Sequence, residues 1–118
     1  MDMNSRMKTR SSHKSTRKGK FTMKLKKYSN PVVAQQQAYK CLGKTAKLYP
    51  SSNPVKKYDI YDPINNKWVH FGQIGYEDFT KHRDKKRRKN YLTRTFSMRG
   101  NWRENPYSAN NLSRCVLW

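Results

Sequence analysis

The chain has 118 residues, enough for one small domain, and its 27 lysines and arginines against 7 aspartates and glutamates give a formal net charge of +20. Apolar residues make up 34% of the sequence, and aromatic residues alone account for 13%. Low aliphatic content with high net charge is typical of chains that do not offset their ordering entropy by burial alone. This composition argues against a self-sufficient enzyme with a large apolar pocket. It favours a chain that folds on or against an acidic partner.

Membrane and compartment signals are weak. The longest uninterrupted apolar run, Cys115–Trp118, is far shorter than the roughly 20 residues of a membrane-spanning helix, so we expect no membrane span. Contact with a membrane surface stays open. The first residues lack the apolar stretch of a secretory signal. Cys41 and Cys115 form no CxxC pair, which favours reduced thiols, with one long-range disulfide as the alternative.

Residues 1–30 hold ten lysines and arginines and one acid, and we interpret them as a basic extended arm. Its candidate contacts to a partner or to phosphates are Arg6, Arg10, Arg17, Lys18 and Lys20. Residues 21–26 alternate apolar and polar side chains, which is the period of a half-buried strand. A short strand added to the sheet edge of a partner is therefore one option for this segment.

Residues 31–54 are expected to form a short helix followed by a Pro-rich linker. Asn30 and Pro31 suit a helix start, and apolar residues then repeat at three- and four-residue spacing. Gly43 is a suitable end signal. Two prolines in residues 50–54 predict a linker without regular structure.

Residues 55–118 are expected to form a module of a β-hairpin and a helix with an aromatic C-terminal tail. Residues 55–61 and 67–72 are β-branched and aromatic, and the segment between them carries Pro, Asn and Asp, which predicts a hairpin. Tyr58, Ile60, Val69 and Phe71 are the candidates for pairing across it. The predicted fold class is small α+β, with a central β-hairpin followed by a basic helix, an N-terminal helix, an extended basic arm and little independent core.

The most informative segment is a second basic block, in which seven of the nine residues 81–89 are Lys or Arg. Glu77 and Asp78 suit the start of a helix, which would place Lys81, Lys85 and Lys89 on one stripe. Like charges at this spacing destabilise an isolated helix by roughly 0.2–0.5 kcal/mol per pair, whereas phosphates or carboxylates of a partner reverse the sign. The candidate binding residues are Lys81, Arg83, Lys85, Lys86, Arg87, Arg88 and Lys89.

Aromatic residues lie around this block rather than inside it. We interpret them as packing anchors, with base stacking as the alternative. The anchors are Trp68, Phe71, Tyr76, Phe79, Tyr91, Trp102 and Trp118.

Residues for catalysis are scarce. His13 lies in the arm, His70 in an expected strand, and His82 among cations that disfavour its protonated form. The sequence shows neither a glycine-rich phosphate loop nor a cluster of metal ligands. We therefore expect no enzymatic activity, no catalytic or metal site, no cofactor and no small-molecule substrate.

Three segments resemble a known family: Lys67–Gly72, Gly75–Asp84 and the ending Leu112–Trp118. They are similar to small basic proteins of the nucleocytoplasmic large DNA viruses, the chlorella viruses and other giant viruses among them. In that family a Tyr-Asp-Pro hairpin leads through a Phe-Gly turn into a helix of the pattern Gly-Tyr-x-Asp-aromatic-Thr-x-His-basic-Asp. The resemblance covers about residues 56–118.

This resemblance implies a virion component assembled in the host cytoplasm. We expect a minor capsid protein that cements the inner face of a large icosahedral capsid, with acidic surfaces of other capsid or virion proteins as its partners. The alternative is a sequence-nonspecific protein that binds and condenses double-stranded viral DNA. A small ribosomal protein is a third option, on composition alone.

Overall fold

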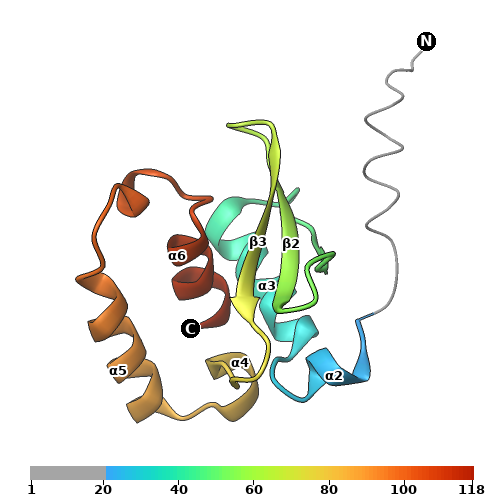
Figure 1. Cartoon of the computed structure of the whole chain (residues 1–118), viewed down its shortest axis with the longest axis vertical. Coiled ribbons are helices and arrows are strands. Elements are labelled where there is room, and N and C mark those ends of the chain that lie inside the picture. The colour runs from blue at the N-terminus through green and yellow to red at the C-terminus, as the bar shows by residue number, and fades with distance from the viewer. Residues whose placement is uncertain (1–20) are drawn as a thin grey trace.

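The computed structural model describes residues 21–118 and confirms the predicted α+β class (Figure 1). The predicted contacts Arg6, Arg10, Arg17, Lys18 and Lys20 lie outside the described residues. The elements in chain order are α2 (Met23–Lys26), α3 (Pro31–Leu42), β1 (Leu48–Pro50), β2 (Lys56–Asp62), β3 (Lys67–Gln73), α4 (Phe79–His82), α5 (Lys85–Phe96), η1 (Trp102–Glu104), α6 (Ala109–Leu112) and η2 (Ser113–Leu117). No helix in residues 21–118 is long and apolar enough to cross a membrane.

The predicted hairpin is the centre of a three-stranded antiparallel sheet of order β1-β2-β3. The four candidates do pair across the hairpin, Tyr58 with Phe71 and Ile60 with Val69. The buried carboxylate of Asp62 closes the turn by accepting hydrogen bonds from the backbone N–H groups of residues 64 and 65, at 2.9 and 3.1 Å. This local carboxylate stabilises a loop that has no two-residue turn motif.

The helix predicted after Pro31 is confirmed as α3. The side-chain oxygen of Asn30 accepts hydrogen bonds from the N–H groups of Val32 and Val33, and Pro31 takes the first helical position. Gly43 ends the helix with a φ of 109°, a conformation that favours glycine. The start and end signals of this helix are local, which explains why the sequence predicts both.

The core lies between the inner face of the sheet, α3 and the C-terminal helices. Its twelve buried apolar residues are Leu25, Ala34, Ala38, Ala46, Leu48, Tyr58, Ile60, Phe71, Tyr107, Leu112, Val116 and Leu117. Three of these are alanines, and no methionine is among them, so the core is small for the length of the described chain. It is assembled from both ends of that chain, since α3 and η2 pack against each other.

Two expectations for the N-terminal half are corrected. Residues 21–26 do not form a strand, because Thr22 caps a short helix by accepting a hydrogen bond from the N–H of Leu25 at 3.1 Å. This turn buries Leu25 and leaves Met23 exposed. Strand β1 is an element that the sequence analysis misses. It is three residues long and ends at Pro50, and proline is tolerated at the edge of a sheet, where its missing N–H is not needed.

The cysteines are joined in a disulfide, which corrects the expectation of reduced thiols. Cys41 lies on α3 and Cys115 on η2, with Cα atoms 6.3 Å apart, within the usual range for a disulfide. The two residues are 74 positions apart in sequence. The bond therefore fixes η2, near the C-terminus, to α3.

Candidate binding surface

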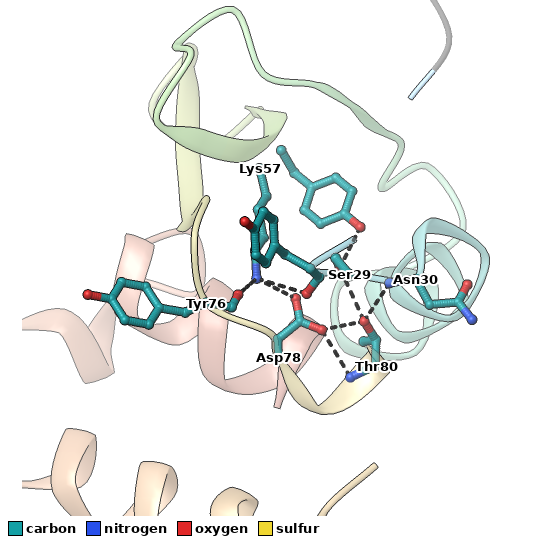
Figure 2. A network of polar contacts seen from close by, with 8 residues as sticks. Ser29, Asn30, Lys57, Tyr76, Asp78 and Thr80 are labelled. Atoms are coloured by element: carbon teal, nitrogen blue, oxygen red, sulfur yellow. Dashed lines mark hydrogen bonds and ion pairs between the residues drawn. The ribbon is translucent and has the colours of Figure 1, made fainter. Parts of the chain in front are cut away.

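A buried ion pair between Lys57 and Asp78 positions the segment that carries the second basic block. The Lys57 Nζ donates to Asp78 Oδ2 at 3.0 Å, and also to the carbonyl oxygens of Tyr76 and Tyr28 (Figure 2). The side chains of the pair are only 3% and 1% exposed. Burial lowers the pKa of Lys57, and the Asp78 charge opposes this effect. All three ammonium protons have partners, so the group is saturated.

A chain of hydroxyl groups extends from the other carboxylate oxygen of Asp78. Asp78 Oδ1 accepts from the N–H and the hydroxyl of Thr80, and Thr80 Oγ1 lies 3.1 Å from Ser29 Oγ (Figure 2). Ser29 Oγ in turn lies 2.7 Å from the Tyr58 hydroxyl. Because the Thr80 proton goes to the carboxylate, Ser29 donates to Thr80 and Tyr58 donates to Ser29. This network joins α4 to β2 and to the start of α3.

The second basic block is two helices rather than one, which corrects the predicted single stripe of Lys81, Lys85 and Lys89. Arg83 has a left-handed φ of 59° and ends α4. The Asp84 carboxylate then caps α5 by accepting from the N–H groups of Lys86 and Arg87. An Asp at this position satisfies orphan N–H groups, and this favours a new helix start over continuation.

The predicted binding residues are all exposed on these two helices. Lys81 and Arg83 belong to α4 and its end, and the five cations 85–89 occupy the first turns of α5. None of the seven forms an ion pair with an acid of residues 21–118. Arg83 and Arg88 place their guanidinium groups 5.2 and 5.5 Å from the centre of the Phe79 ring. These cation–π contacts orient the two arginines, and neither has a carboxylate side chain of residues 21–118 as its partner.

The C-terminal segment holds α5 from one side. The rings of Tyr91 and Trp118 are stacked, with centroids 4.3 Å apart. Arg114 Nη1 donates to the Leu92 carbonyl at 2.6 Å and to Thr95 Oγ1 at 2.7 Å, and Arg88 donates to the Trp118 carbonyl. Thr95 is the one buried residue of α5. The helix is thus attached by a few specific contacts rather than by an apolar face.

The predicted packing anchors have different surroundings. Phe71 is in the core, and the rings of Tyr91 and Trp118 stack on each other. Phe79 contacts the arginines, Trp68 contacts Tyr49 and Tyr61 edge-on, and Trp102 donates from its indole N–H to the Met98 carbonyl. Tyr76 is not an anchor, since it is 68% exposed. It follows Gly75 in the loop before α4. Its carbonyl oxygen, not its ring, makes the contact with the fold, by accepting a hydrogen bond from Lys57 Nζ.

The histidines do not complete a catalytic arrangement in the described chain. Ser51 Oγ and His70 Nδ1 both contact Oδ1 of the buried Asp59, so the serine does not lie on the far ring nitrogen as a nucleophile–base pair requires. Burial, and then the nearby Arg87 charge, lower the pKa of His82, in the direction that the sequence predicts. Residues 21–118 contain no group of three or more side chains suited to hold a metal ion.

A groove of about 630 Å³ lies between α5, the end of β3 and the C-terminal helix. Its lining includes three cations that sequence analysis only partly singles out: Lys56, Arg87 and Arg94. Lys56 is not singled out in the sequence, because this residue lies in the expected strand 55–61 and outside both basic blocks. Arg94 lies seven positions after Arg87, so the two share one face of a helix. Extending the predicted helix beyond residue 89 would have identified it.

The comparisons with known proteins concern the sheet and the basic helices. A model of a family of unknown function (DUF5754) matches residues 46–95. The match spans the three strands, α4 and nearly all of α5, and leaves out the C-terminal residues that hold α5. No curated protein and no solved structure matches the chain.

Proposed function

We propose that the chain is a non-enzymatic structural protein of the virion of a large DNA virus. In this role it is a minor capsid protein that ties acidic protein surfaces together at the inner face of the capsid, after assembly in the host cytoplasm. The resemblance of residues 56–118 to small basic proteins of such viruses supports the proposal.

The distribution of charge is the structural observation that carries the proposal. Residues 21–118 contain six acids, and three of them, Asp59, Asp62 and Asp78, are buried and hydrogen-bonded inside the fold. Lysines and arginines are exposed instead, apart from Lys57 and the partly buried Lys56 and Arg114. The folded surface therefore presents cations that the chain itself does not neutralise, which suits adhesion to an acidic partner.

Particles assembled with altered chains test this function. Replacing Lys85, Lys86, Arg87 and Arg88 with alanine removes four unpaired cations, and we expect much weaker retention of the chain in DNA-free shells. A control with the same loss of charge replaces Lys24, Lys40, Lys44 and Lys47, which are exposed elsewhere in the fold. Wild-type chain that leaves the particle together with the DNA would contradict a capsid role.

Double-stranded DNA is the second candidate partner, favoured by the five successive cations at the start of α5. Because successive residues are rotated by about 100°, these cations surround the helix and contact phosphates without reading bases. In that case duplex affinity falls roughly a thousandfold or more between about 50 and 200 mM salt, if six or more phosphates are contacted. Salt-insensitive or absent duplex binding would leave the capsid role.

A further inference from the structure

The face of α5 that lines the groove is unusual for a helix packed on its own protein. Arg87, Tyr91 and Arg94 follow one another on α5 at spacings of four and three residues and line the groove, and Met98, just beyond the end of the helix, lines it too. Such a stripe is normally apolar and closes onto the core. Here two of the three helical positions are exposed arginines, and neither forms an ion pair within residues 21–118. Repulsion and desolvation of these charges oppose closure of the groove.

Residues outside α5 supply further charged and apolar side chains to the lining of the groove. Lys56 adds a third cation, from β2, that has no ion pair in the described chain. The lining also includes Lys57, which is paired with Asp78, and Glu77 is its one carboxylate.

Tyr76 and Met98, also in the lining, are 68% and 49% exposed and supply accessible apolar surface. The Arg94 guanidinium lies 5.4 Å from the centre of the Tyr91 ring, a contact that orients it. The groove therefore combines cations with accessible apolar side chains.

We propose that this groove binds an extended acidic segment of a partner protein. Carboxylates of the segment contact Arg87, Arg94 and Lys56, and an apolar side chain packs against the exposed side chain of Met98. Seven residues separate the two arginines, about 10 Å along the helix axis, so a segment with at least two carboxylates is needed to reach both. This inference rests on the proposed function and names the contact through which an acidic partner is held.

A peptide fits the groove better than a nucleic acid for two reasons. The phosphodiester backbone offers no apolar side chain to pack against the exposed Met98 and Tyr76, whereas a peptide offers one. Glu77 repels phosphates but accepts hydrogen bonds from peptide N–H groups. A volume of about 630 Å³ is within the range of pockets that enclose compact ligands, and a short peptide segment occupies such a volume.

A binding experiment with matched variants tests the proposal. The probe is a fluorescein-labelled peptide of sequence Glu-Glu-Leu-Glu-Glu-Leu-Gly-Gly, titrated with the full chain at about 0.15 M salt, where distant charges are screened. The double variant Arg87→Glu, Arg94→Glu reverses the groove charges. Its control, Lys85→Glu, Lys89→Glu, makes the same change in net charge on the opposite side of α5. All four positions are exposed, and circular dichroism checks that each variant folds.

We expect the groove variant to lose at least about tenfold in affinity and the control less than about threefold, because charge-assisted contacts are local. A peptide with serine in place of leucine should bind more weakly to wild type. If the groove variant does not fold, Lys56→Glu, compared with Lys67→Glu at the far end of the sheet, makes the same test from β2.

The outcomes separate this inference from the proposed function. Equal losses of peptide affinity in both double variants would show that binding depends on the overall positive charge, and would overturn the groove as the binding site. The proposed structural role of a cationic protein would not be affected. No binding of the peptide to wild type would overturn the groove as well. A short DNA duplex that binds wild type and loses most affinity in the groove variant would assign the groove to nucleic acid. Retention in DNA-free shells is measured separately and decides the capsid role.

Discussion

Tyr91 of α5 and Trp118 lie parallel, with their ring planes 9° apart. The ring of His82 is tilted against Trp118, with ring centres 5.1 Å apart, so one indole contacts both basic helices. Three residues before it, Cys115 is bonded to α3. The position of the exposed cations thus depends on a C-terminal segment that is itself fixed to α3.

Replacing Trp118 with alanine should loosen α5 without unfolding the sheet. We expect the free energy of unfolding to fall by about 1–3 kcal/mol, because a partly buried ring and a stacked pair are lost. Hydrogen exchange should accelerate most in the α5 amides near Tyr91 and Leu92. Trp118→Phe keeps an aromatic ring at this position and should retain most of the protection. Acceleration in the strands equal to that in α5 would contradict a local role.

Loss of the disulfide should destabilise the whole described fold. A crosslink between residues 74 positions apart restricts the unfolded chain, and its removal is expected to cost about 2–4 kcal/mol. Urea unfolding of the Cys41→Ser, Cys115→Ser variant measures this loss. Reductant should lower the stability of wild type to the same level and leave the variant unchanged. A reductant effect on the variant would point to another cause.

The sequence predicts those features whose signals are local. Asn30, Pro31 and Gly43 mark the ends of α3, and the two β-branched and aromatic runs in residues 55–72 mark the hairpin in which Tyr58 pairs with Phe71. The break between α4 and α5 is missed for a physical reason. Asp84 can pair with Arg88 in a continuous helix or cap a new one, and a run of cations gives no apolar period to decide between them.

The site depends on contacts that sequence spacing does not reveal. Lys57 and Asp78 are 21 residues apart and meet only when the start of α4 lies against β2 in the folded chain. The groove likewise needs Lys56 from β2 to face Arg87 and Arg94 from α5. The basic residues themselves are evident from composition, whereas their arrangement around one groove is a property of the tertiary fold.

Removing one partner of the buried ion pair should be among the most damaging single changes. Lys57→Met keeps the length of the side chain but leaves the Asp78 carboxylate buried without its cation, and we expect a loss of about 3–5 kcal/mol. Lys56→Met, one residue earlier on the same strand and in no ion pair of the described chain, should cost less than about 1 kcal/mol. Chemical denaturation of both variants compares them directly. Similar losses would show that the ion pair is not the cause.

Acid should destabilise the fold partly through Asp59. Burial alone would raise the pKa of Asp59, but hydrogen bonds from Ser51, His70 and Ser52 outweigh burial and hold this pKa below its ordinary value. A group with a lowered folded-state pKa binds protons more weakly in the native state. Its contribution is therefore complete above the unfolded pKa, about 3.9, and is lost as pH falls through the folded pKa.

The variant Asp59→Asn isolates this contribution. We expect it to be less stable than wild type at pH values above about 5, with a gap that narrows as the pH falls below about 4. Urea unfolding over this pH range measures the gap. Glu104→Gln removes an exposed acid and serves as the control. A gap between Asp59→Asn and wild type that stays constant down to the lowest pH would contradict the role given to this carboxylate.

Gly72 is required where the end of β3 passes the C-terminal helix. Its φ is +77°, and a Cβ atom there would lie 2.9 Å from Leu117 Cδ1 and 3.1 Å from Lys57 Cβ. Gly72→Ala therefore adds backbone strain to a clash beside the buried ion pair, and we expect a loss of about 2–4 kcal/mol. Gly75→Ala is the matched control, because its φ is +109° but no atom lies within 4 Å of the added Cβ. Thermal unfolding should place it between wild type and Gly72→Ala, since it bears the strain without the clash. Equal destabilisation of the two variants would mean that backbone strain alone, and not contact with Leu117, demands glycine at this point.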